Sequence, residues 1–144
     1  MQEAVSGAPV PGAVGRPGDV LLVLSGHDTN LLNISRMLGL SWRLPGYQPV
    51  DTPPGGALVF TLWRDSRGGY FVKAEYLAQT LDQMRNGARL SLAAPPASED
   101  LTLPACRPAP SSGCPWESFR RAVQKAIDPA FTNLGPDPQS PPVQ

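Results

Sequence analysis

The sequence has no excess of either charge, no long apolar run and only one histidine, and each absence excludes a class of function. Twelve Lys and Arg balance twelve Asp and Glu in 144 residues, so there is no basic face for nucleic acid or for an anionic membrane surface. The best apolar run, Val20–Leu24, is far shorter than the roughly 20 residues that span a bilayer. We therefore expect neither a nucleic acid nor a membrane as partner.

Cysteine is also scarce, and its placement argues against a metal site. Cys106 and Cys114 are the two cysteines, and the seven residues between them are rich in Pro, Ser and Gly. This spacing is compatible with a small disulfide loop and with two free thiols. Two thiols and one distant histidine do not make a tetrahedral ligand set, and we expect no metal and no cofactor. The first residues show neither the basic nor the apolar stretch of a signal peptide.

Proline and glycine are plentiful, at 18 and 14 residues, which predicts that much of the chain is loop. The continuous apolar run Val20–Leu24 predicts a fully buried strand, of the kind found in parallel sheets. The pattern then becomes helical, because Leu31, Ile34 and Leu38 recur at the spacing of one helix face and Gly39 is a natural stop.

The second half of the chain contains further strand and helix patterns. Ala57–Trp63 and Tyr70–Leu77 predict two strands that form a hairpin, and Thr80–Arg85 predicts a short helix. Residues 91–115 are expected to be loop. Pro115–Ile127 predicts a helix with proline at its first position, and its apolar face consists of Trp116, Phe119, Val123 and Ile127.

The residues with most chemical potential follow the first predicted strand. His27 and Asp28 lie where that strand turns into a helix, and open α/β sheets bind ligands at this position. The free N–H groups of a helix start favour an anion, an imidazole suits a phosphate, and a carboxyl group there suits proton donation. A structural interpretation stands beside this one, because Asp28, Thr29 and Asn30 are all good helix N-caps.

Most of the arginines have a simpler interpretation than phosphate binding. Arg43, Arg64 and Arg67 are candidate phosphate ligands, but Arg64 follows a strand and Arg67 lies in a turn, which favours solvated charges. Arg120 and Arg121 lie off the apolar face of the last predicted helix, which indicates a solvent-facing helix surface.

Several stretches in order resemble the C-terminal part of the histidine acid phosphatases, in particular the bacterial phytases and glucose-1-phosphatases. They are VLLVLSGHDTNLLNISRMLGL, DTPPGGALVFTLWRD, QTLDQMR and LTLPAC. The resemblance implies an α/β fold that is part of a phosphoglycerate-mutase-like three-layer α/β/α sandwich, with a mainly parallel sheet and a C-terminal antiparallel hairpin. It covers residues 18–127. We expect residues 1–17 to be a linker with the end of a truncated helix, and residues 128–144 to be a Pro-rich disordered tail.

The resemblance also implies an activity and roles for individual residues. The family hydrolyses phosphate monoesters through a phosphohistidine intermediate. By resemblance, His27 contacts the phosphate and Asp28 protonates the leaving-group oxygen, while Thr29 and Asn30 cap the helix and support substrate binding. The family pattern also implies a Cys106–Cys114 disulfide, which favours a periplasmic or secreted location.

The sequence departs from the family pattern in one important respect. The family's nucleophile lies in an N-terminal Arg-His-Gly-x-Arg-x-Pro motif, which this sequence lacks, and His27 is already matched to another role. We interpret the chain as a C-terminal portion of a phosphatase that is inactive alone and has two partners, a phosphate monoester and the missing N-terminal segment of the domain. This interpretation predicts exposed apolar surface where that segment packs. The alternative is a non-catalytic anion-binding or interaction domain derived from a phosphatase.

Overall fold

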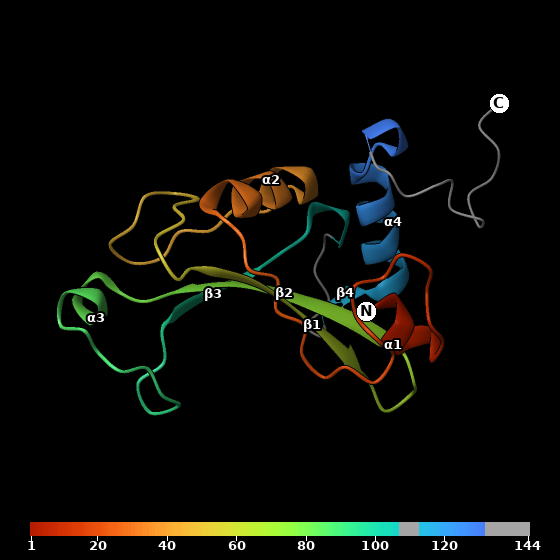
Figure 1. Ribbon diagram of the computed structural model, residues 1–144, viewed down its shortest axis with the longest axis horizontal. Helices are drawn as coiled ribbons and strands as arrows, with labels where there is room; N and C mark the ends of the chain where they lie inside the picture. Colours follow the sequence, from red (N-terminus) through yellow and green to blue (C-terminus); the bar gives the residue numbers. More distant parts are fainter. Residues whose placement is uncertain (107–112, 132–144) are drawn as a thin grey trace.

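A computed structural model of the chain describes residues 1–106 and 113–131 (Figure 1). Its centre is an antiparallel sheet of order β1-β2-β3, in which a short β4 also pairs with β2. The strands are β1 (Ala57–Arg64), β2 (Tyr70–Ala78), β3 (Ala97–Leu101) and β4 (Cys114–Pro115). The α-helices are α1 (Gln2–Ser6), α2 (Asp28–Leu38), α3 (Leu81–Arg85) and α4 (Trp116–Ala126), and two 3₁₀ turns are η1 (Pro104–Cys106) and η2 (Pro129–Phe131).

The predicted hairpin of β1 and β2 is confirmed, with pairing from Ala57 opposite Leu77 to Arg64 opposite Tyr70. Its turn is closed by Asp65, whose Oδ1 accepts hydrogen bonds from the amides of Arg67 (2.9 Å) and Gly69 (2.7 Å). Short acidic side chains commonly close turns in this way. One face of β2 is buried and carries Val72, Ala74, Tyr76 and Ala78.

The core lies on that face of the sheet. The rings of Trp42 and Tyr76 stack with their centroids 4.2 Å apart and an interplanar angle of 13°, and both side chains are buried. The indole Nε1 of Trp42 donates to the Asp51 carbonyl at 2.8 Å, so the buried indole N–H is satisfied. The other buried apolar residues of this cluster are Leu40, Leu44, Leu101, Leu103, Cys106, Cys114 and Phe119.

The helices α2 and α4 contact each other and stand on the same side of the sheet (Figure 1). The predicted end of α2 is confirmed, because Gly39 has φ 65 and terminates it. Leu31 and Leu38 pack against the core, whereas Ile34, which shares their helix face by its spacing, is exposed and Ser35 is buried. The small Ser35 side chain donates to the Leu32 carbonyl at 2.8 Å and fits where a larger residue would hold the helix away.

The α/β class and the helices α3 and α4 are confirmed, but the predicted loop over residues 91–115 is partly wrong. This segment contains β3 and β4. The sequence of β3, ASEDL, lacks apolar alternation and buries only Leu101, so periodicity gave no signal for it. A disulfide joins Cys106 to Cys114, with Cα atoms 5.3 Å apart, as the family resemblance implied. The tail over residues 132–144 lies outside the described residues.

The prediction of a buried parallel strand at Val20–Leu24 is wrong for the described chain. The five side chains are 52–101% exposed, the segment is not a strand, and all described sheet pairs are antiparallel. A strand that is apolar on both faces requires neighbours on both sides, and no described strand takes that place. In the part of the chain that the structure describes, no helix is long and apolar enough to cross a membrane.

Candidate active site

The His27–Asp28 pair lies where the extended segment after Leu24 meets α2. His27 is the N-cap residue of the helix, with extended backbone angles (φ −103, ψ 168). Its amide donates to Oδ1 of Asn30 at 2.7 Å, and the Asn30 amide donates to the His27 carbonyl at 3.0 Å. A Cβ at Gly26 would lie 2.9 Å from Asn30 Oδ1, so a larger residue there would displace the Asn30 side chain from this contact. The backbone at the start of α2 is therefore fixed by local hydrogen bonds.

The two side chains of the pair are exposed. One carboxylate oxygen of Asp28 accepts the Thr29 amide at 2.7 Å, which is a local capping contact. Among the described residues, the second carboxylate oxygen of Asp28 makes no hydrogen bond, whereas the His27 side chain forms a capping box with Asn30 at the helix start. Local capping thus involves both side chains of the pair and leaves one carboxylate oxygen of Asp28 without a partner among the described residues.

Thr29 and Asn30 occupy different positions at the site. The Asn30 side chain is turned back onto the His27 amide, so it acts as a cap. Thr29 is exposed in the first turn of α2. The 11-residue helix directs its positive N-terminal end at this region, and that end favours an anion beside His27 and Asp28.

Two cavities of the described chain lie away from the pair. One, of about 150 Å³, lies beside the Cys106–Cys114 disulfide and is lined by Val72, Leu103 and neighbouring residues. Another, of about 220 Å³, lies between α1 and the start of α4. Neither is lined by His27 or Asp28. Within the described residues, no three His, Cys, Asp or Glu side chains gather as a metal site.

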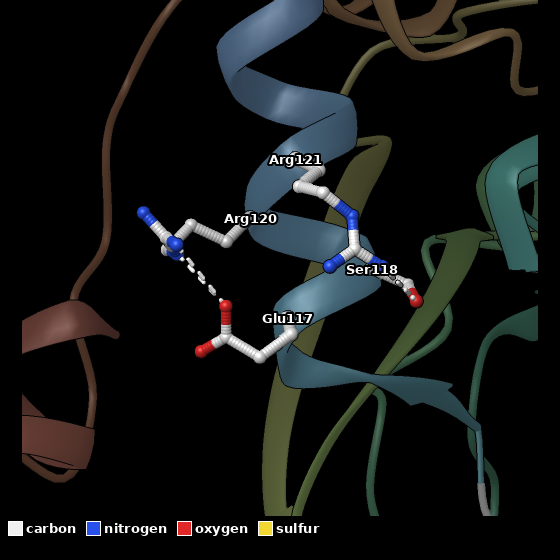
Figure 2. Close-up of polar contacts among 4 residues, drawn as sticks. All are labelled: Glu117, Ser118, Arg120 and Arg121. Carbon is white, nitrogen blue, oxygen red and sulfur yellow. Dashed lines mark hydrogen bonds and ion pairs between the residues drawn. The ribbon is translucent and has the colours of Figure 1, made fainter. Parts of the chain in front are cut away.

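Three further arginines, one of them the candidate phosphate ligand Arg64, contact neighbouring side chains and do not contact the His27–Asp28 pair. The guanidinium of Arg64 lies over the Tyr70 ring, 5.5 Å from its centroid. On α4, Arg120 donates to Oε2 of Glu117 through Nε (3.2 Å) and Nη2 (3.1 Å), and Arg121 donates to Oγ of Ser118 at 3.2 Å (Figure 2). These contacts agree with solvated surface charges and assemble no phosphate clamp.

Two buried polar groups, the side chains of Glu3 and Tyr76, were not predicted from the sequence. The Glu3 side chain is buried in the segment expected to be a linker, and its Oε1 accepts the Val10 amide at 3.2 Å. The Tyr76 hydroxyl is buried and has no hydrogen-bond partner among the described residues. Burial, with a smaller contribution from the nearby Asp51 charge, raises the pKa of Tyr76 to about 12. Neither group lies in the His27–Asp28 motif, and no sequence pattern distinguished them from ordinary helix and strand residues.

Comparison with known proteins assigns a family to the region around the pair. Residues 15–76 match the model of the histidine phosphatase superfamily (branch 2). The chain is 44% identical over 112 residues to phytase AppA of Escherichia coli (strain K12), which covers 76% of this chain and 26% of that protein. It is 36% identical over 108 residues to glucose-1-phosphatase of Providencia rettgeri, covering 74% of this chain and 26% of that protein.

A solved structure shows the same similarity in three dimensions. The chain superposes on Hafnia alvei phytase, solved in complex with tartrate, with a TM-score of 0.74 and 44% sequence identity. That comparison covers 85% of this chain and 30% of the phytase chain. The chain therefore spans about a quarter of the length of the curated relatives it matches.

Proposed function

The chain belongs to the histidine phosphatase superfamily, and on that premise we propose that it contributes His27 and Asp28 to the active site of a phosphatase for phosphate monoesters. The observation that carries the proposal is the open end of α2. There the side chains of His27 and Asp28 are exposed, and one carboxylate oxygen of Asp28 has no hydrogen-bond partner among the described residues, inside the segment that matches the family.

The proposed role of His27 is to contact the phosphate. An imidazole N–H donates a hydrogen bond to a phosphate oxygen, and a protonated ring adds a positive charge. The first N–H groups of α2 and the helix dipole act in the same direction. Because the sequence contains a single histidine, the nucleophile that attacks phosphorus is assigned to another part of the domain.

The proposed role of Asp28 is to protonate the leaving group. As the nucleophile bonds to phosphorus and the P–O bond to the alcohol breaks, the proton of the Asp28 carboxyl group moves to the departing oxygen. A phosphate anion bound beside the carboxyl group favours its protonated form. Water then attacks the phosphorus, the bond between phosphorus and the nucleophilic nitrogen breaks, and the proton that water loses returns to the Asp28 carboxylate. This releases phosphate and regenerates both the nucleophile and the acid.

The substrate class and the compartment follow as parts of the same proposal. Two relatives carry the names phytase and glucose-1-phosphatase, and both names describe the hydrolysis of phosphate monoesters. The Cys106–Cys114 disulfide is the kind of bond that persists in an oxidising compartment such as the periplasm. We therefore place the protein in the periplasm or outside the cell.

The proton-donor role is tested in a chimera of phytase AppA whose matched segment is replaced by this chain. We expect Asp28→Asn to lower kcat about 100-fold or more for an alkyl phosphate. The loss is expected to be far smaller for p-nitrophenyl phosphate, because a good leaving group needs no proton. Asp19→Asn is the matched control, since Asp19 is also exposed and accepts a local backbone amide, that of Arg16 at 2.8 Å. Equal turnover of Asp28→Asn and its parent on both esters would contradict the assignment.

A second candidate function is a non-catalytic anion-binding domain, favoured by the open helix start and by the lack of a second histidine. The two are separated by titrating inorganic phosphate into the isolated chain and recording the His27 ring signals by NMR. Saturable shifts that vanish in Asn30→Ala, which loses the cap on the His27 amide, indicate a site preformed in this chain. Absence of any shift at millimolar phosphate indicates that the site needs the rest of the domain.

A further inference from the structure

Asn86 and Gly87, directly after α3, form the one Asn-Gly pair in the sequence. The sequence contains three other asparagines, and each of them precedes a leucine or an isoleucine. The side chain of Asn86 is exposed, and it makes no hydrogen bond among the residues that the structure describes. An exposed asparagine amide beside a residue that has no side chain is a chemically labile combination.

The reaction open to this pair is the loss of the side-chain amide group. The backbone nitrogen of Gly87 attacks Cγ of Asn86, and the new carbon–nitrogen bond closes a five-membered succinimide ring. The bond from Cγ to the side-chain nitrogen breaks, and that nitrogen leaves as ammonia together with the proton of the Gly87 amide. Water then opens the ring. Cleavage between Cγ and the ring nitrogen gives aspartate, and cleavage at the main-chain carbonyl carbon gives isoaspartate. Glycine favours the attack because it has no Cβ beside the attacking nitrogen.

The end of α3 requires the glycine that makes Asn86 labile. Gly87 has φ 55, in the left-handed region that a residue with a Cβ rarely adopts. Its amide donates to the Met84 carbonyl at 3.2 Å, and the next amide, that of Ala88, donates to the Gln83 carbonyl at 2.8 Å. These two bonds form a Schellman motif, which satisfies free carbonyls at the end of the helix. The labile pair is therefore a consequence of how α3 ends.

The same turn controls how easily the reaction starts. The nitrogen that attacks is the one whose N–H donates to Met84, so this hydrogen bond must break before Gly87 can approach Cγ of Asn86. α3 has five residues, and none of them is buried. Its N-terminal end is capped by Thr80, whose Oγ1 accepts the Gln83 amide at 3.1 Å. Because so short a helix is only marginally stable, opening of its last turn costs little free energy.

We propose that Asn86 is a site of spontaneous deamidation, and that opening of the last turn of α3 sets the rate. The product adds a negative charge at the C-terminal end of the helix, where the helix dipole is already negative. Isoaspartate also lengthens the main chain by one carbon, so the two hydrogen bonds of the turn no longer form together. The modification therefore loosens the connection that follows α3. Asn86 lies outside the His27–Asp28 pair, and its modification is independent of the proposed phosphatase activity.

The experiment follows deamidation of the full chain at mildly alkaline pH by peptide mapping with mass spectrometry. Asn33 is the internal control, since it is also exposed but precedes Ile34. We expect Asn86 to deamidate at least tenfold faster than Asn33, with both isoaspartate and aspartate among the products, and Asn86→Gln to abolish the reaction at this position. In urea, where α3 is unfolded, Asn86 should react at least threefold faster than in buffer.

The role of the turn is tested with Thr80→Ala, which removes the N-terminal cap of α3. We expect this variant to raise the deamidation rate at Asn86 at least twofold. The control Ser118→Ala, which removes a hydroxyl group from the first turn of α4, should leave that rate unchanged. Equal rates at Asn86 and Asn33 in buffer would overturn the modification site. Equal rates at Asn86 for the folded and the urea-unfolded chain, or for Thr80→Ala and its parent, would overturn the control by the turn.

Discussion

Two apolar segments of this chain, Val20–Leu24 and β1, reach opposite environments. β1 (Ala57–Arg64) pairs along its whole length with β2, and only its last two residues are exposed. Val20–Leu24 has an equally apolar sequence and no described partner. β1 meets β2 after a five-residue turn, whereas nothing close in sequence pairs with Val20–Leu24. Both segments are apolar enough to favour burial. Only β1 is buried in this chain, because a strand that can pair with it lies close in sequence.

The packed core and the proposed site also lie in different parts of the chain. The sheet, α4 and the Trp42–Tyr76 stack form a core of their own, and Leu31 and Leu38 anchor α2 to it. The His27–Asp28 pair lies at the N-terminal end of α2, one turn before Leu31 and next to the unpaired segment. The region for which we propose the chemistry is therefore next to the segment that has no described partner.

The largest effect is expected in the packed region, at Trp42. Its side chain is 2% exposed and stacks on Tyr76, so Trp42→Ala should lower the free energy of unfolding by about 3–5 kcal/mol. Trp63 is the control. It is 53% exposed with Lys73 over its ring, and Trp63→Ala should cost less than about 1 kcal/mol. Urea denaturation followed by circular dichroism measures both. Similar losses for the two variants would show that the packed region has no distinct core.

An intermediate effect on stability is expected when valine is replaced by alanine in the sheet and, for comparison, in the exposed segment Val20–Leu24. Val72 on β2 is buried and Val23 in the open segment is exposed. Val72→Ala should lower the free energy of unfolding by about 2 kcal/mol, from lost methyl burial and the cavity left behind. Val23→Ala should change it by less than about 0.5 kcal/mol. A large loss at Val23, measured by the same denaturation, would mean that the segment is packed in solution and would break the comparison.

The sequence predicted the elements whose signals are local. The β1–β2 hairpin has two apolar runs around a Gly-rich turn, α3 begins with a Thr80–Gln83 capping box, and α2 ends at Gly39. The position of His27 and Asp28 at the start of a helix was predicted for the same reason. These elements needed only residues within one or two turns of each other.

The failures depend on long-range packing. β3 is a polar strand that forms because β2 offers it an edge, and Ile34 is exposed because α2 packs through Ser35 instead. Val50 has φ 58, which a β-branched residue rarely adopts; its amide donates to the Trp42 carbonyl at 2.8 Å and its side chain packs on the core. The residues that surround His27 could not be predicted either, because a local sequence pattern does not show which distant segments lie beside the site.

The smallest effect concerns how well the packed region excludes water, and it is read from Tyr76. Burial raises the pKa of Tyr76 to about 12, from 10.0 in its unperturbed state, so the fold favours the neutral phenol. The stabilisation from this shift is fully present below pH 10 and is lost as the pH rises through 12. We expect the free energy of unfolding to fall by about 1 kcal/mol between pH 9 and pH 11 from this group.

The variant Tyr76→Phe should lose this decrease in the free energy of unfolding between pH 9 and pH 11. Tyr70→Phe is the control, since Tyr70 lies on the half-buried end of β2, and it should keep the decrease. Identical pH profiles for the parent and Tyr76→Phe, measured by urea denaturation, would show that water reaches the centre of the core, and the contrast with the open segment would then fail.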